Sequence, residues 1–426
     1  MAGKTPREVI PEEAFMTKIT GKISRRKFLS SSASFLTTTG LFGLPRQHCS
    51  LNSLADQSQV TEKKILCRTL GKTGMRLPVV NMGVMNSFNP ALVQSSYEIG
   101  IRYFDTAAYY GRGENERMLG RVFKEMNVRD NVFIGTKIFI PHQQRRMPPN
   151  EAKGFFLKTA EESLKRLQTD YIDILFSHNV QTPEYLNNPG ILEALEILKE
   201  QKKARFIGFS THTNMTELFK EAVQTDTYDV ILTAFNYAME GDDNLMNALR
   251  AAAGKGLGLI AMKTQCTQYW YREYVPPASQ KYYQGKILHT AVLKWALRHG
   301  FVTTAIPGFT TFQQMEEDFS VAYDLEYTPE ERQFLQDRNI KNQLGYCLQC
   351  NQCLNSCPMR VDIPALMRTH MYISCYNNYV HAKQTLEETP REQSLLICNQ
   401  CTECTAQCVN HIPVKKRIDE LKMFYG

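Results

Sequence analysis

Short apolar runs alternate with longer amphipathic stretches between residues 65 and 337. The runs have the length and β-branched content of buried strands, and the stretches between them repeat apolar residues at helical spacing. Eight strand–helix units of this kind predict an α/β fold, a parallel (β/α)8 TIM barrel. The predicted strands cover 79–84, 103–105, 132–137, 172–177, 206–210, 230–234, 257–262 and 303–306, and the clearest helices cover 90–98, 114–125, 156–167, 192–199 and 287–298.

A doubly wound sheet is the competing interpretation, because it also alternates strands with helices. A dinucleotide-binding sheet of that type carries a Gly-x-Gly-x-x-Gly turn after its first strand, and no such turn follows residues 79–84. The barrel is therefore favoured. The active site of a barrel lies at the carboxyl ends of its strands, where side chains of successive strands converge.

Four chemically active side chains occur at these predicted strand ends. Asp105, Lys137 and His178 end or directly follow three successive strands, and Tyr110 comes five residues after Asp105. Each residue alone has a structural explanation, as a cap, a surface charge or a core side chain. Together they indicate an active site, because an ammonium group near a phenol lowers the phenol's pKa from about 10 and makes it a better proton donor.

The sequence around these residues resembles the aldo/keto reductase family. The resemblance covers residues 64–335 and implies a barrel enzyme that reduces a small carbonyl compound or oxidises the corresponding alcohol. It rests on FDTAAYYGRGENE at 104–116, LGKTG at 70–74, YID at 171–173, IGFS at 207–210 and AIPG at 305–308.

The resemblance also implies a role for each of the four residues. Tyr110 is the general acid and base, and Lys137 lowers its pKa. Asp105 holds Lys137 by a charge-assisted hydrogen bond, and His178 orients the carbonyl oxygen and donates a hydrogen bond to it. Tyr109 is the neighbouring alternative to Tyr110, but the five-residue spacing from Asp105 favours Tyr110.

A nicotinamide cofactor, NAD(P)(H), is a further implication of the resemblance. Neither Gly308 nor Gln314 carries the positive charge that would hold a 2′-phosphate, so NAD and NADP both stay open. The positions that correspond to cofactor contacts are, at the nicotinamide end, Ser210, Asn236, Met262 and Lys263, and, at the adenosine end, Gly308, Gln314 and Asp318.

Nine of the twelve cysteines fall within residues 347–408, and eight of these nine form two runs of the same spacing. Each run reads Cys-x2-Cys-x2-Cys-x3-Cys, as in bacterial ferredoxins, where the fourth cysteine of a run crosses to the other [4Fe–4S] cluster. Zinc sites and disulfides do not require this repeat, so both alternatives are disfavoured. The predicted ligand sets are Cys347, Cys350, Cys353 and Cys408 for one cluster, and Cys398, Cys401, Cys404 and Cys357 for the other.

The insert between the two cysteine runs, at 363–396, has a helical pattern. It resembles the mainly α-helical ferredoxin-type domains that are fused to larger oxidoreductases. Residues 340–426 are therefore predicted to form a second, small iron–sulfur domain. Cys375 lies alone in the insert and is expected to pack in the core of this domain.

Most of the positive charge lies at the N-terminus. The formal charge is +7, and residues 1–48 contribute +5 with eight Lys and Arg against three Glu. The nearly neutral remainder argues against nucleic-acid binding. The paired Arg25 and Arg26 before Phe28, with an uncharged stretch up to residue 45, resemble a twin-arginine signal. Residues 1–50 are predicted to direct export to the periplasm by the twin-arginine translocase; the alternative is a disordered basic tail on a cytoplasmic protein.

These features predict an oxidoreductase of the aldo/keto reductase type with two electron-transfer clusters. Its substrate would be a small carbonyl compound or alcohol, and its clusters would exchange electrons with a partner protein or a quinone-linked acceptor. The alternative is an electron-transfer or docking protein in which the clusters act and the barrel is largely a scaffold. The aromatic segment 264–286 would either cover the active site or pack against the C-terminal domain.

Overall fold

The computed structural model describes residues 64–141, 144–265, 288–337 and 345–426. The predicted export signal at 1–50 and nearly all of the aromatic segment 264–286 lie outside these ranges, so both interpretations stay predictions. All of the described residues belong to one compact unit. No helix within the described ranges is both long enough and apolar enough to cross a bilayer.

Eight parallel strands form the predicted barrel. Each strand pairs with its neighbours in chain order, and Val80 bridges to Ala305 so that the first and last strands meet. All eight strands occur close to their predicted positions, although the first and last keep only two residues each. The strands are β3 (Met82–Gly83), β4 (Tyr103–Asp105), β5 (Phe133–Ile138), β6 (Ile172–Ser177), β7 (Ala204–Thr211), β8 (Val230–Ala234), β9 (Gly258–Met262) and β10 (Thr304–Ala305).

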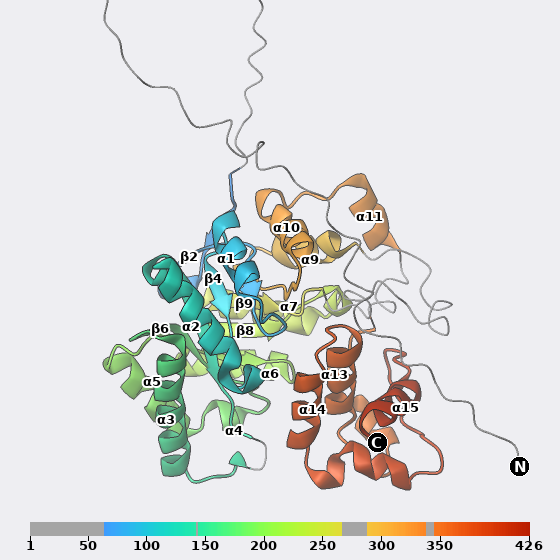
Figure 1. Cartoon of the computed structure of the whole chain (residues 1–426). Helices are drawn as coiled ribbons and strands as arrows, with labels where there is room; N and C mark the ends of the chain where they lie inside the picture. The colour runs from blue at the N-terminus through green and yellow to red at the C-terminus, as the bar shows by residue number, and fades with distance from the viewer. Residues whose placement is uncertain (1–63, 142–143, 266–287, 338–344) are drawn as a thin grey trace, which may run out of the picture. The chain divides into compact units, whose positions relative to one another are not determined.

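Helices cover the outside of the sheet, and Figure 1 shows three of them, α2, α3 and α5, side by side. Helix starts follow local chemistry: the side-chain oxygen of Asn188 accepts hydrogen bonds from the first free amides of α5, and Pro189 occupies the next position. The helices of this part are α1 (Pro90–Ile99), α2 (Glu114–Met126), α3 (Pro149–Leu167), α4 (Pro183–Leu186), α5 (Pro189–Glu200), α6 (Met215–Thr225), α7 (Asp243–Gly254), α9 (His289–Arg298), α10 (Phe312–Ser320) and α11 (Pro329–Gln336).

A short hairpin that the sequence reading missed closes the amino-terminal end of the barrel. Strand β1 (Cys67–Thr69) pairs antiparallel with β2 (Arg76–Pro78). Leu77 of the hairpin belongs to the same buried cluster as Ile174 inside the barrel. Gly71 lies so close to the start of β9 that an added Cβ would be 2.4 Å from a backbone nitrogen. Because the hairpin closes this end, we expect the active site at the carboxyl end of the barrel.

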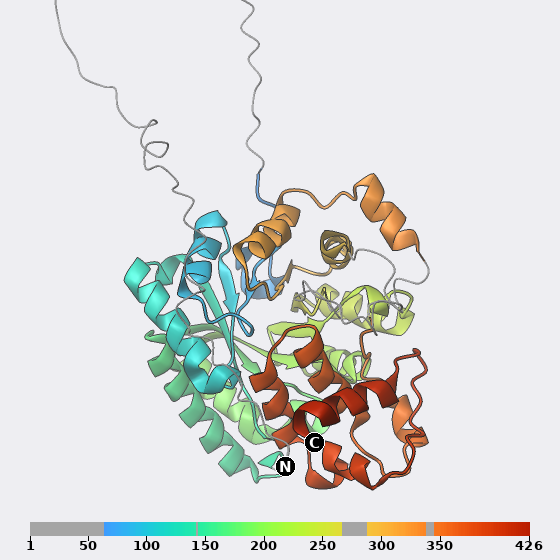
Figure 2. The same cartoon turned by 45° about the vertical axis from the view of Figure 1, so that its right-hand side comes forward.

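The C-terminal region is helical, as its sequence pattern predicted. Figure 2 shows its helices, coloured red, grouped together, and α13 contacts both α14 and α15. Every residue of α13 from Ile363 to Ile373 is buried. Its buried polar side chains, Arg368, Thr369 and His370, each make a hydrogen bond within the protein. The elements are α13 (Ile363–Ser374), α14 (Tyr379–Glu388) and α15 (Val414–Tyr425), with short 3-10 turns at η8 (Gln352–Ser356), η9 (Arg391–Gln393) and η10 (Leu395–Gln400).

Candidate active site

Strand periodicity explains why the predicted residues share one site. Alternate side chains of a strand face the barrel interior, where Tyr103 and Phe176 belong to the inner core. Two residues further along their strands, Asp105 and His178 reach the carboxyl end on the same face. On the strand between them, Gly135 leaves room for the hydroxyl of Tyr103, since an added Cβ would lie 2.0 Å from that oxygen.

The carboxylate of Asp105 is held between two neighbours inside the barrel. One oxygen accepts a hydrogen bond from the Nζ of Lys137, and the other accepts one from the hydroxyl of Tyr103 at 2.9 Å. The same Nζ donates to the carbonyl of Thr106 at 2.6 Å. Burial raises the pKa of Asp105 and lowers that of Lys137, and the ion pair opposes both shifts. Each partner thus offsets part of the cost of burying the other.

Tyr110 follows β4 in the turn η3 (Tyr110–Gly113), where Gly111 adopts a left-handed φ of 56° before α2 begins. The ring of Tyr110 lies 5.2 Å from the Nζ of Lys137, centroid to nitrogen, and 5.9 Å from the ring of His178. Tyr109 packs instead against the ring of Phe139 at 5.2 Å. Tyr110 is therefore the tyrosine that the structure brings to Lys137.

The expected effect of Lys137 on Tyr110 needs correction. Lys137 was expected to lower the pKa of Tyr110, but that pKa lies well above its usual value, first because of burial and then because of Asp105. The physical reason is the burial of the phenol beside the Asp105 carboxylate, which the ammonium of Lys137, with its hydrogen bonds to Asp105 and Thr106, does not offset. Tyr110 consequently keeps its proton at neutral pH and is available as an acid.

His178 is a neutral imidazole in this setting. Burial lowers its pKa well below the usual value, and the charges of Lys137, His381 and Arg145 add to the shift. Its Nδ1 is buried and has no hydrogen-bond partner within the described ranges. A neutral imidazole with an unsatisfied ring nitrogen suits hydrogen bonding to a ligand.

A cleft brings these groups together at the carboxyl end of the barrel. Its walls include Asp105, Tyr110, Lys137 and His178, and also Tyr372, Tyr376 and His381 from the C-terminal region. The hydroxyl of Tyr372 accepts a hydrogen bond from the Nζ of Lys263 at 3.3 Å, and the ring of His381 lies 4.3 Å from that of Tyr372. The cleft is thus built from both parts of the chain.

The residues proposed for cofactor binding divide into two groups. Four of them line the cleft, namely Ser210, Met262, Lys263 and Gly308.

The other three have structural partners instead. Asn236 caps the turn after β8 and donates to the carbonyl of Lys263 at 3.2 Å. Gln314 caps the start of α10. Asp318 is buried and accepts a hydrogen bond from Gln265 at 2.5 Å, and burial raises its pKa to about 8. Their roles toward a cofactor stay predictions.

Several residues that line the cleft were not predicted from the sequence. His212 lies two residues beyond Ser210, directly after the end of β7, and lines the cleft as Ser210 does, so continuing the strand alternation by one step would have predicted it. Gln265 follows Lys263 after β9 and lines the cleft beside it. The C-terminal residues Tyr372 and His381 carried no such signal, because their contact with the barrel is set by packing and not by local pattern.

The ten described cysteines are free thiols. The two cysteine runs meet at Ser356, whose carbonyl accepts a hydrogen bond from Thr405 at 2.8 Å and whose hydroxyl accepts one from the amide of Gln407 at 2.9 Å. Cys375 is buried, as expected. Over the parts of the chain that the structure describes, no three His, Cys, Asp or Glu side chains form a group able to hold a single metal ion.

The thiols influence one another in two groups of four. The pKa of Cys353 is raised to about 12, first by burial and then by Cys347, Cys350 and Cys408. In the second group, the pKa of Cys398 is raised to about 11. Burial is the largest cause, and the neighbouring thiols raise the pKa further. Those neighbours are Cys357, Cys404 and Cys401.

Comparison with known proteins gives the same picture of the barrel. Residues 84–281 match the model of the Aldo/keto reductase family. The chain is 28% identical to the L-galactose dehydrogenase of Arabidopsis thaliana over 62% of its own length and 90% of that protein. It is 23% identical to an L-glyceraldehyde 3-phosphate reductase of Escherichia coli O157:H7, over 62% and 89%. An aldo-keto reductase of Bacillus halodurans in its holo form shares the fold, with a TM-score of 0.52 at 22% identity over 64% of this chain and 96% of that one.

Proposed function

Since residues 84–281 match the Aldo/keto reductase family model and the chain is an oxidoreductase, we propose that it interconverts a small carbonyl compound and its alcohol with a nicotinamide cofactor. The observation that carries the proposal is the single cleft lined by Asp105, Tyr110, Lys137 and His178. These four residues supply an acid, a charged pair and a neutral hydrogen-bonding group around one position. That set is what a carbonyl reduction needs besides its hydride donor.

The cleft residues fit a nicotinamide dinucleotide. Lys263 lies on the wall of the cleft, and its ammonium group suits a phosphate group. The hydroxyl oxygen of Thr264 is buried and has no hydrogen-bond partner in the described ranges, so it has capacity for a ligand. When bound, the cofactor supplies or accepts the hydride. Ser210, Met262, Lys263 and Gly308 are the proposed contacts, and the choice between NAD and NADP stays open.

Each catalytic side chain has a defined task in this proposal. Tyr110 is protonated at neutral pH because its pKa is raised, and its hydroxyl donates the proton to the substrate oxygen in the reduction. The ammonium of Lys137, 5.2 Å from the Tyr110 ring centroid, stabilises the phenolate that remains. Asp105 keeps Lys137 in place, and His178 orients the substrate oxygen by a hydrogen bond.

The walls of the cleft favour an oxygen-rich substrate. His178, His212 and His381 each have a buried Nδ1 without a hydrogen-bond partner among the described residues, and all three line the cleft. A substrate with several hydroxyl groups would satisfy more of these nitrogens than an apolar carbonyl compound. The names of the two relatives above, a galactose dehydrogenase and a glyceraldehyde phosphate reductase, support a sugar-like substrate.

We also propose two [4Fe–4S] clusters in an iron–sulfur domain over residues 340–426. The support is the spacing of the cysteines and the grouping of their thiols into two sets of four, each with one cysteine from the other run. The hydrogen bonds at Ser356 hold the two runs together, as this exchange of the fourth cysteine requires. Such clusters carry single electrons, which a partner protein or a quinone-linked acceptor would take up or supply.

Export is a separate proposal. Arg25 and Arg26 precede an uncharged stretch in a basic N-terminus, and this pattern supports export to the periplasm by the twin-arginine translocase. Cell fractionation tests it: conversion of both arginines to lysine is expected to keep the protein in the cytoplasm. An unaltered protein that fractionates with the cytoplasm would contradict the proposal and support the basic-tail alternative.

The catalytic proposal is tested by carbonyl reduction with NADH and NADPH across a panel of hydroxyaldehydes and ketoses. Tyr110→Phe removes the proton donor and is expected to reduce kcat by a factor of about 100 or more. Tyr109→Phe is the matched control, since Tyr109 packs against Phe139, and it should keep most of the activity. Equal kcat in Tyr110→Phe and the unaltered protein would contradict the assignment of Tyr110 as the proton donor. If dye reduction persists without any turnover that depends on Tyr110, the clusters act and the barrel is a scaffold.

A further inference from the structure

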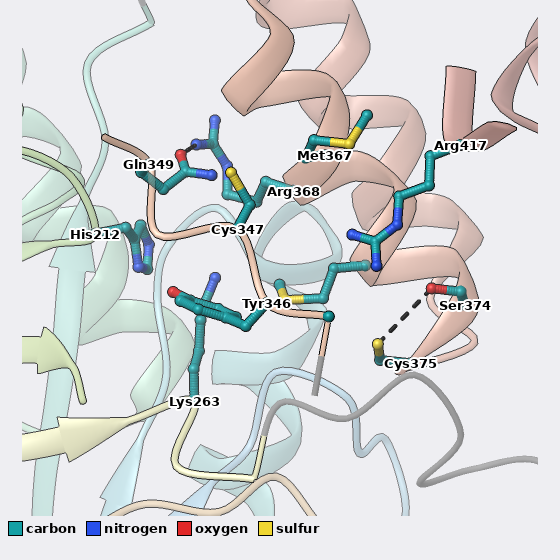
Figure 3. Close-up of a pocket in the computed structure, with 12 residues that line it drawn as sticks. His212, Lys263, Tyr346, Cys347, Gln349, Met367, Arg368, Ser374, Cys375 and Arg417 are labelled. Carbon is teal, nitrogen blue, oxygen red and sulfur yellow. Dashed lines mark hydrogen bonds between the residues drawn. The ribbon is translucent and has the colours of Figure 1, made fainter. Parts of the chain in front are cut away.

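A second, narrow pocket lies beside the predicted ligand Cys347. Figure 3 shows Arg417 entering it from α15, while His212 and Lys263 belong to the barrel. His212 and Lys263 also line the catalytic cleft. The cysteine set that includes Cys347 is therefore the one that borders the catalytic cleft.

Arg417 is unusual among the charged groups of this region. Only 3% of its surface is exposed. Its Nε and one terminal nitrogen, Nη2, are buried without a hydrogen-bond partner among the described residues. Glu420 on the same helix accepts a hydrogen bond from His370 at 2.5 Å and lies 4.0 Å from Lys416. A buried guanidinium with unused donors is costly unless an acceptor is present in the functional protein.

Helix α15 carries a second cation, Lys422, toward the other cysteine set. Its Nζ donates to the carbonyl of Cys398 at 3.0 Å. Arg417 and Lys422 are five residues apart, which places them about 140° apart around the helix axis.

We infer that Arg417 is a positioning residue that donates hydrogen bonds to the sulfur atoms of the cluster held by Cys347, Cys350, Cys353 and Cys408. This inference rests on the proposed clusters and adds a residue that the cysteine spacing does not reveal. A cluster bound by four thiolates is anionic, and its sulfurs accept hydrogen bonds. Hydrogen bonds to these sulfurs stabilise the reduced form and raise the reduction potential.

The test is a redox titration of the anaerobically purified full chain, followed by electron paramagnetic resonance, with iron counted in each sample. Arg417→Met is expected to make the one-electron reduction of one cluster about tenfold less favourable, which is a fall of 59 mV in its midpoint potential. The second cluster should keep its potential. Lys416→Met is the matched control, because it removes the same charge from an exposed position of the same helix.

Lys422→Met should lower the potential of the cluster that Arg417→Met leaves unchanged, which assigns each signal to its cysteine set. If Arg417→Met loses iron, Arg417→Lys serves as the second variant. It keeps the charge but offers fewer donors, and it should hold its iron and show a smaller fall in the same signal.

Three results would overturn the inference at full iron content: no shift in Arg417→Met, equal shifts in both clusters, or the same shift in Lys416→Met. A failure of the underlying proposal looks different. In that case the unaltered protein would contain no iron or acid-labile sulfide, before any variant is compared.

Discussion

The ring of His381 on α14 lies 5.7 Å from the ring of Tyr110 at the carboxyl end of the barrel. The ring of Tyr110 also lies 5.9 Å from the ring of His178. The proposed catalytic acid is therefore next to one histidine of the barrel and one histidine of the C-terminal region. His381 lines the cleft and is buried. The C-terminal region therefore forms part of the wall of the cleft, where we propose that the substrate binds.

His381→Phe should weaken substrate binding because it removes the polar nitrogen from this wall and keeps its bulk. We expect KM for an oxygen-rich carbonyl substrate to rise by about tenfold, the value of one hydrogen bond to a buried group, with a smaller change in kcat. Val380→Ala, at the exposed neighbouring position, is the control. An unchanged KM in His381→Phe would remove this residue from the substrate site.

Asp105→Asn should destabilise the barrel as well as slow the reaction. The change leaves the ammonium of Lys137 buried without its charged partner, and breaking such a pair costs about 3–5 kcal/mol. The free energy of unfolding in urea measures the effect. Glu193→Gln breaks the more exposed pair with Lys153 and should cost at most about 1 kcal/mol. Similar losses in the two variants would contradict the burial argument.

Asp318 should make stability depend on pH. Burial raises its pKa to about 8 in the folded protein, above the value of about 3.9 in an unfolded chain. Its contribution is therefore fully present below about pH 4 and is lost as the pH rises toward 8. The difference in unfolding free energy between the unaltered protein and Asp318→Asn should fall across this range. Glu316→Gln, at an exposed position, should leave the profile unchanged, and a flat difference for Asp318→Asn would refute the assignment.

Cys350→Ser should remove one cluster and leave the other. The ligand sets predict about four irons remaining out of about eight per chain, because each cluster holds four. Iron and sulfide analysis of the anaerobically purified variant gives the count. Cys375→Ser is the control, since Cys375 is buried in the helical core and belongs to neither set. Eight irons in Cys350→Ser would show that Cys350 is not a ligand.

Local sequence was enough to predict that the candidate catalytic residues lie together at one end of the barrel. Asp105, Lys137 and His178 end their strands, and strand periodicity places them on one face. His212 follows the same alternation of side chains and could have been predicted from it. The hairpin at 67–78 was missed because its strands have only three residues each, too few to show a period.

Tertiary packing determined the pKa and the hydrogen-bond partners of several site residues, which the periodicity of the sequence does not predict. The high pKa of Tyr110 follows from burial beside Asp105, and the same sequence in an exposed site would titrate differently. Asn236 and Gln314 took capping positions because nearby backbone amides offered hydrogen bonds.

The sequence by itself determined the alternation that builds the barrel, the strand-end residues and the spacing of the two cysteine runs, because each of these depends on neighbours along the chain. Only the tertiary structure decided that His381 and Tyr372 line the cleft and that Arg417 is buried beside Cys347. These contacts join segments far apart in the chain. They depend on how whole helices pack, which no local pattern of residues specifies.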